Sequence, residues 1–292
     1  PCLVPDPLLL DETLCVDVGS SQPVWLTIFV PPDAQPGRWR GEVKISAAGE
    51  TVGVPLSLVV HPVTLPEQRH LKVTNWMNTH NYAKFYGTEM YSPRFWQVVE
   101  AYARNVAAHG QNVIPCWDWP RIFQEGDGTL TFDYSDFDRW IETFMRAGCG
   151  DMIEAGGFAQ RGLGKWDVPW FEWKEPTVYR RDGARVRLDP QTVIQQLVVS
   201  LVSHMRERGW LDRLVMHVVD EPAKHTEADY KRKSRLIHEL APDVRYLEAM
   251  SLLDARGYLD IWVPNLDHLN ENLDHYLALR EEAGFELWFY TC

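Results

Sequence analysis

Two adjacent acids, Asp220 and Glu221, follow an apolar run at residues 214–219 and precede Pro222. Packing alone seldom ends a buried strand with two carboxyls, so these side chains are candidates for chemistry. Side chains alternate between faces within a strand, but where the strand ends the backbone turns, and two neighbours can reach one pocket. Pro222 cannot donate to a strand ladder, and we expect it to fix this turn.

The spacing of these carboxyls favours one kind of glycoside hydrolysis. A conventional retaining glycosidase places two carboxyls about 5 Å apart, on opposite sides of the bond that is cleaved. An adjacent pair better suits a sugar whose own 2-acetamido oxygen attacks the anomeric carbon. Asp220 would then orient the acetamido N–H, and Glu221 would protonate the leaving oxygen and later activate water. Two like charges this close raise one pKa, which favours a protonated acid near neutral pH. Strand-end acids also cap helices or form ion pairs, and that alternative stays open.

The elements that must position these acids alternate between strand and helix from residue 69 onward. This rhythm predicts a parallel sheet in an α/β domain over residues 69–292, namely a (β/α)8 TIM-like barrel that stops after its seventh strand. In such a barrel the catalytic groups sit at the carboxyl ends of the strands. The predicted strands span 71–77, 112–116, 151–155, 214–219, 245–250, 261–263 and 286–290. The predicted helices span 92–110, 134–150, 189–210, 227–242 and 270–285.

Residues 1–68 have a different pattern. Short apolar runs at 23–31 and 53–62 flank a segment rich in Pro and Gly, and they predict a partial, Ig-like β-sandwich domain. The chain begins at Pro1, not Met, so we expect a piece of a longer protein.

Polar and aromatic residues that end or follow the other predicted strands are candidates for substrate binding. We expect Tyr290 to donate a hydrogen bond to the acetamido oxygen as it attacks. His217, inside the fourth barrel strand, is expected to be a buried structural histidine. The candidate binding residues are Asn75, Trp76, Trp117, Asp118, Gln160, Asn265 and Tyr290.

Tryptophan is the compositional outlier, with 13 in 292 residues. Several lie in predicted loops, where a flat ring with a polar edge suits a sugar; burial in the core is the alternative. The predicted loop over residues 156–188 is unusually long and rich in aromatic residues, which indicates a functional segment.

Composition and motifs exclude other classes. The net charge of −12 and the absence of a basic run argue against nucleic-acid binding. No apolar run approaches the roughly 18 residues of a membrane span. No metal or phosphate motif is present, so we expect no metal and no cofactor. Five scattered cysteines leave the compartment open, and nothing indicates the oligomeric state.

Several stretches together resemble glycoside hydrolase family 123, a β-N-acetylgalactosaminidase family with an associated domain of unknown function. They are VPPDAQPGRWRGEVKI (30–45), YSPRFWQVVEAYARNVAAHGQNVI (91–114), FDYSDFDRW (132–140), GGFAQRG (156–162), HVVDEP (217–222) and LWFYTC (287–292). The resemblance implies removal of terminal β-linked N-acetylgalactosamine with retention, by substrate assistance. Carried over by position, Asp220 orients the acetamido group and Glu221 is the general acid/base.

Two departures from the family pattern keep other functions open. Arg161 stands where an aromatic is expected, and residues 75–87 are an unusual version of the first segment. One alternative is a carbohydrate-binding protein without turnover. The other is a barrel glycosidase for a sugar that lacks an acetamido group.

Overall fold

The structure is a computed structural model that describes residues 15–66 and 69–291. The chain divides into two compact units, Pro1–Gln68 and Arg69–Cys292.

The first unit contains one antiparallel hairpin, β1 (Gly37–Ala47) and β2 (Glu50–Val60). Ala48 and Gly49 connect the strands with φ of 51° and 85°, as a tight two-residue hairpin turn requires. The strand predicted at residues 23–31 is not formed: those residues are exposed and pair with no strand within 15–66. The described part of this unit is therefore a hairpin, and the predicted sandwich is not seen there.

The second unit is built around an open, six-stranded parallel sheet, in the order β14-β13-β12-β11-β6-β3. Its strands are β3 (Val113–Cys116), β6 (Met152–Gly156), β11 (Leu214–His217), β12 (Arg245–Met250), β13 (Ile261–Pro264) and β14 (Glu286–Leu287). The predicted parallel α/β sheet is confirmed, but the described residues close no barrel, so the truncated TIM barrel is not confirmed.

The segment expected to be the first barrel strand, residues 71–77, is not a strand. Val73 alone joins it to the sheet by backbone bonds, accepting from the N–H groups of Asn112 and Val113 at 3.2 Å each. The N–H of Val73 bonds to the side-chain oxygen of Asn112 at 2.9 Å. The side-chain oxygen of Asn112 thus takes the place that a backbone carbonyl would have in a β-ladder, so residues 71–77 do not continue as a strand of the sheet.

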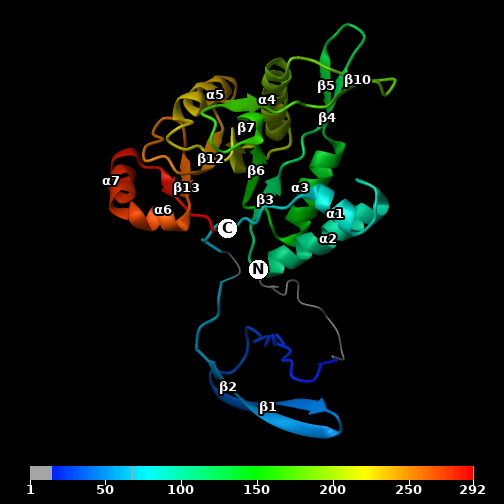
Figure 1. The fold of residues 1–292 in the computed structure, drawn as a ribbon, viewed down its shortest axis with the longest axis vertical. Helices are drawn as coiled ribbons and strands as arrows, with labels where there is room; N and C mark the ends of the chain where they lie inside the picture. The colour runs from blue at the N-terminus through cyan, green and yellow to red at the C-terminus, as the bar shows by residue number, and fades with distance from the viewer. Residues whose placement is uncertain (1–14, 67–68, 292) are drawn as a thin grey trace. The chain divides into compact units, whose positions relative to one another are not determined.

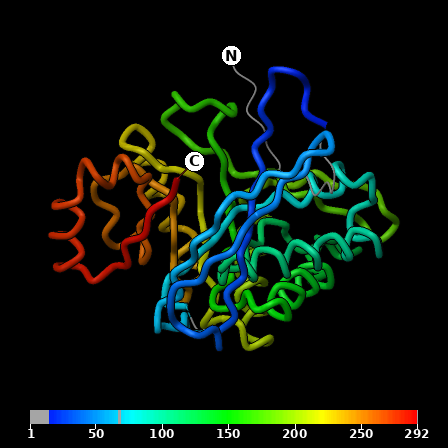
Figure 2. The backbone as a smooth tube through the Cα atoms, turned by 90° about the horizontal axis from the view of Figure 1, so that it is seen from below, coloured from blue at the N-terminus to red at the C-terminus, as the bar shows by residue number. Residues whose placement is uncertain are grey.

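The five predicted helices form close to their expected ranges, and two short helices, at residues 79–85 and 266–271, form outside the predicted set. Ser92 caps α2 by accepting from the N–H of Phe95, with Pro93 in the first turn, and Asp189 caps α4. The helices are α1 (Thr79–Phe85), α2 (Pro93–Ala108), α3 (Ser135–Ala147), α4 (Pro190–Glu207), α5 (Glu227–Leu240), α6 (Leu266–Glu271) and α7 (Leu273–Ala283). Figure 1 and Figure 2 show α6 and α7 at one end of the sheet and α2 and α3 at the other.

The two faces of the sheet have different environments. Along each strand alternate side chains enter different apolar clusters, as strand geometry dictates. Ile114, Ile153 and Met216 belong to the main core, which also takes in the apolar sides of the helices. Val113, Met152 and Val215 belong to a smaller cluster on the other face. Two positions after Met152 and Val215, this second face carries Glu154 and His217.

The long predicted loop, residues 156–188, is largely ordered into short strands. β7 (Ala159–Arg161) and β8 (Phe171–Trp173) form a hairpin next to the acid pair. β9 (Val178–Arg180) and β10 (Arg185–Val186) join β4 (Arg121–Gln124) and β5 (Leu130–Asp133) in a four-stranded sheet. Ile122 and Val178 are almost fully buried beneath that sheet. Apolar burial therefore orders a segment that has little strand pattern.

No helix in the described ranges is both long and apolar enough to cross a membrane.

Candidate active site

The acid pair follows β11 on a bend in the chain. After His217 the backbone bends through Val218–Asp220, and Glu221 takes a left-handed conformation with φ of 49°. A residue with a side chain pays about 1 kcal/mol or more for that conformation, and such strain gathers at functional sites. The carbonyl of Pro222 accepts from the N–H of Ser251 at 3.1 Å, which ties the turn to the loop after β12.

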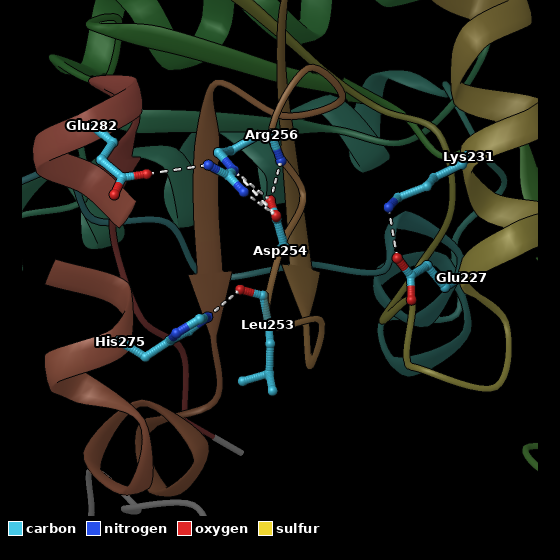
Figure 3. Close-up of polar contacts among 7 residues, drawn as sticks. All are labelled: Glu227, Lys231, Leu253, Asp254, Arg256, His275 and Glu282. Carbon is cyan, nitrogen blue, oxygen red and sulfur yellow. Dashed lines mark hydrogen bonds and ion pairs between the residues drawn. The ribbon is translucent and has the colours of Figure 1, made fainter. Parts of the chain in front are cut away.

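That loop is itself anchored to α7. Arg256 binds Asp254 at 2.6 Å and Glu282 at 3.2 Å, and Nε2 of His275 lies 2.8 Å from the carbonyl oxygen of Leu253 (Figure 3). The support of the strained turn thus extends from β11 through the loop after β12 to a helix.

Glu221 has contacts from two distant segments. The hydroxyl of Tyr290 donates to Oε1 of Glu221, and the guanidinium of Arg161 donates to its backbone carbonyl. Tyr290 reaches this place because the chain after β14 continues beside β13, where its N–H donates to the carbonyl of Pro264 at 3.1 Å. β14 is shorter than the strand predicted at 286–290, but the residues that follow it bring Tyr290 to Glu221.

Asp220 opens into a cavity of about 500 Å³. Burial and the neighbouring Glu221 raise the pKa of Asp220, although the positive charges of His217, Lys174 and Arg161 act in the opposite direction. The cavity is lined by Trp76, Met77, Asn78, Thr79, His80, Trp117, Asp118, Gly157, Ala159, Gln160, Arg161, Trp166, Lys174, His217, Val219 and Asp220.

The floor of the cavity contains a buried row of three ionisable side chains on adjacent strands. Nε2 of His217 lies 2.8 Å from Glu154, and Nδ1 lies 2.9 Å from Glu248. Burial alone would lower the pKa of His217, but its bonds to the two carboxylates outweigh burial and raise the pKa to about 10. Glu248 also accepts from the N–H groups of Val218 and Val219, at 2.6 and 3.1 Å. The expectation of a buried, hydrogen-bonded His217 fits this geometry, and Glu248 holds the backbone that leads to Asp220.

Two indole rings form a wall above this floor. The rings of Trp76 and Trp117 meet edge to face with centroids 4.8 Å apart, and each also packs against the His217 ring. Nε1 of Trp76 donates to Glu154 at 2.9 Å, which fixes the ring although the residue is 49 % exposed. The same buried row of side chains therefore positions both the backbone that leads to the acid pair and the ring of Trp76.

The other predicted binding residues divide into two groups. Asp118 and Gln160 line the cavity, and Asp118 is held by the hydroxyl of Thr79 at 2.6 Å. Asn75 and Asn265 do not line it, and neither do Tyr290 and Glu221. The amide of Asn75 donates to Gln111 at 3.0 Å, and Asn265 caps α6 by accepting from the N–H of Asp267.

The sequence did not single out Lys174 as a site residue. It follows β8, half-buried on the cavity wall, and burial lowers the pKa of its ammonium against the attraction of Asp220 and Glu248. Nothing in the local pattern marks it, because pairing of β7 with β8 brings it to the cavity. The sequence also did not single out Gly156 and Gly157 as site residues. Gly157 lines the cavity, and a Cβ on Gly156 would lie 2.3 Å from the carbonyl oxygen of His217.

No cluster of His, Cys, Asp and Glu within the described ranges is arranged to hold a metal ion. The chemistry of the cavity is that of carboxyls, a hydroxyl, ammonium and guanidinium groups, and indole rings.

Residues 76–292 match the family described as glycoside hydrolase 123, catalytic domain. The chain belongs to glycoside hydrolase family 123. A solved family 123 glycoside hydrolase from Clostridium perfringens, described in connection with glycolipid glycan hydrolysis, has a similar fold, with a TM-score of 0.69 and 17 % identity. The similarity covers 90 % of this chain and 51 % of the solved chain, so this chain spans about half the length of that protein. A search of curated proteins finds no match.

Proposed function

We propose that this family 123 protein is a glycoside hydrolase that removes terminal β-linked N-acetylgalactosamine with retention, through substrate-assisted catalysis. The observation that carries the proposal is the placement of two adjacent carboxyls. Asp220 lines the cavity. Glu221, the next residue, does not itself line it, and its carboxyl accepts from the hydroxyl of Tyr290. Membership in family 123 supports the reaction class.

In the proposed first step the acetamido oxygen of the substrate forms a bond to the anomeric carbon as the glycosidic bond breaks. Glu221 gives its proton to the departing oxygen, and Asp220 accepts a hydrogen bond from the acetamido N–H as positive charge develops there. In the second step Glu221 takes a proton from water, whose oxygen attacks the anomeric carbon and opens the cyclic intermediate. Two inversions give net retention.

Tyr290 has a defined part in this proposal. Its hydroxyl donates to Oε1 of Glu221, the carboxyl that transfers the proton. Turning toward the substrate would let the same hydroxyl donate to the acetamido oxygen. Trp76 and Trp117 would pack against the sugar ring, above the His217 floor.

The test is calorimetric titration with the thiazoline derived from N-acetylgalactosamine, which mimics the cyclised intermediate, of the wild type and of Asp220→Asn. We expect tight binding to the wild type and binding at least about tenfold weaker in the variant, because the carboxylate of Asp220 accepts a charge-assisted hydrogen bond from the protonated ring nitrogen of the analogue and a neutral amide loses that charge. Wild-type protein that is folded but does not bind thiazoline, yet hydrolyses a plain β-hexoside, would refute the acetamido mechanism. Binding without any product from a β-N-acetylgalactosaminide would instead indicate a carbohydrate-binding protein.

A further inference from the structure

Trp166 is an aromatic side chain of the cavity wall that no step above uses. It lies between β7 and β8, lines the cavity together with Asp220, and is 60 % exposed. A large apolar ring left open on a cavity wall is a natural place for a ligand to cover.

The ring is held in place from one side. The guanidinium carbon of Arg161 lies 4.7 Å from the centroid of the Trp166 ring and 5.0 Å from that of Phe171, so the cation sits between two aromatic residues. The carbonyl oxygen of Trp166 lies 2.9 Å from Nε2 of His225. A ring supported in this way is a pre-formed platform, which loses little entropy when a ligand stacks on it.

Arg161 also fixes where this platform lies relative to the proposed chemistry. The same guanidinium that supports Trp166 donates to the backbone carbonyl of Glu221. Glu221 must stand within hydrogen-bond reach of the departing oxygen, so the group that leaves lies on the side of Glu221. Trp76 and Trp117 lie instead over His217, where the sugar that is cleaved off would bind.

We infer that Trp166, supported by Arg161, is the stacking platform for the aglycone, and that this aglycone is a pyranose. The inference rests on the proposed function. A flat indole suits the apolar face of a sugar ring, and the exposed amide of Gln160 on the same cavity wall can bond to its hydroxyls. Arg161 thereby has a use at the position where family resemblance led us to expect an aromatic.

The experiment compares two ligands that differ in whether they carry an aglycone. The first is a disaccharide of N-acetylgalactosamine β-linked to galactose, measured by kcat/KM. The second is the thiazoline, which has no aglycone, measured by Kd. For Trp166→Ala we expect kcat/KM to fall about tenfold and the Kd for thiazoline to stay unchanged. Trp166→Phe should recover most of the loss, because the smaller ring still stacks.

Trp170→Ala is the matched control, since Trp170 lies in the same segment and does not line the cavity; both values should match the wild type. The inference is overturned if Trp166→Ala leaves kcat/KM unchanged, or if it weakens thiazoline binding as much as it lowers kcat/KM. If the proposed function is wrong, the wild type itself will neither hydrolyse the disaccharide nor bind thiazoline. In that case both the proposed function and this inference are refuted.

Discussion

At the scale of single residues, Glu221 has both an unusual geometry and a proposed role as general acid/base. Its backbone is strained, its carboxyl accepts from Tyr290, and its carbonyl accepts from Arg161. Glu221→Gln keeps the shape but has no proton to give, so kcat on the disaccharide should fall about 10²- to 10⁴-fold. A substrate with a good leaving group needs less protonation and should lose less. Steady-state kinetics on both substrates would measure this.

Glu227→Gln makes the same chemical change elsewhere and serves as the control. Glu227 pairs with Lys231 at 2.6 Å on the first turn of α5 (Figure 3) and does not line the cavity. The Glu227→Gln variant should leave kcat on the disaccharide unchanged. Full activity of Glu221→Gln on the disaccharide would show that Glu221 is not the acid.

The raised pKa of Asp220 predicts the acid limb of the pH profile. Asp220 must be ionised to accept from the acetamido N–H, so kcat/KM should fall as pH drops through this pKa, at a higher pH than for an ordinary aspartate. Lys174 lowers the pKa of Asp220 by its charge. Lys174→Met should therefore move the acid limb to higher pH. The measurement is kcat/KM against pH for both proteins.

Lys72→Met is a suitable comparison, since Lys72 pairs with Asp151 at 2.6 Å before β6 and does not line the cavity. Its acid limb should coincide with that of the wild type. A limb that moves to lower pH in Lys174→Met would contradict the assignment of that limb to Asp220.

At the scale of elements, the carboxyl ends of β6 and β11 meet too closely for a side chain. Gly156 has φ of 109°, and a Cβ there would lie 2.3 Å from the carbonyl oxygen of His217. Gly156→Ala should therefore lower the free energy of unfolding by at least about 2 kcal/mol, since both backbones must shift. Gly164 has φ of 64° but open space around it, so Gly164→Ala should cost only about 1 kcal/mol. Urea unfolding of the two variants would compare them; equal losses would mean that the close approach costs nothing.

The sequence predicts elements well where the signal is local. The ranges predicted at 92–110, 189–210 and 245–250 agree closely with α2, α4 and β12. The sequence does not predict elements whose formation depends on contacts with other segments of the chain. Residues 71–77 have strand composition, but the side chain of Asn112 interrupts their ladder. Within 156–188, β9 depends on pairing with β4 and on burial, and β7 and β8 depend on pairing with each other.

The same distinction holds for the candidate site. Asp220, Trp76, Trp117, Asp118 and Gln160 could be proposed because they follow apolar runs, and the structure places them on one cavity. Lys174 and the bonds from Glu248 to the backbone after β11 arise from pairing between segments far apart in the chain. A motif of adjacent residues cannot reveal such contacts.

At the scale of the whole molecule, the two units differ in how much they bury. In residues 15–66, all that is described of the first unit, every residue is exposed or half-buried, and Trp39, Ile45 and Val52 are more than half exposed. All of the buried residues of the described ranges lie in Arg69–Cys292. Because buried apolar area is the main source of stability, we expect the second unit to carry nearly all of the unfolding free energy.

A chain that begins at Arg69 should therefore unfold cooperatively, with a free energy of unfolding within about 0.5 kcal/mol of that of the full chain, as for changes on an exposed surface. It should also bind the thiazoline with the same Kd, because every residue that lines the cavity lies after residue 69. Urea unfolding and calorimetry on both chains would measure this. Loss of cooperative unfolding in the shorter chain would mean that residues 1–68 contribute to the stability of the second unit, contrary to this prediction.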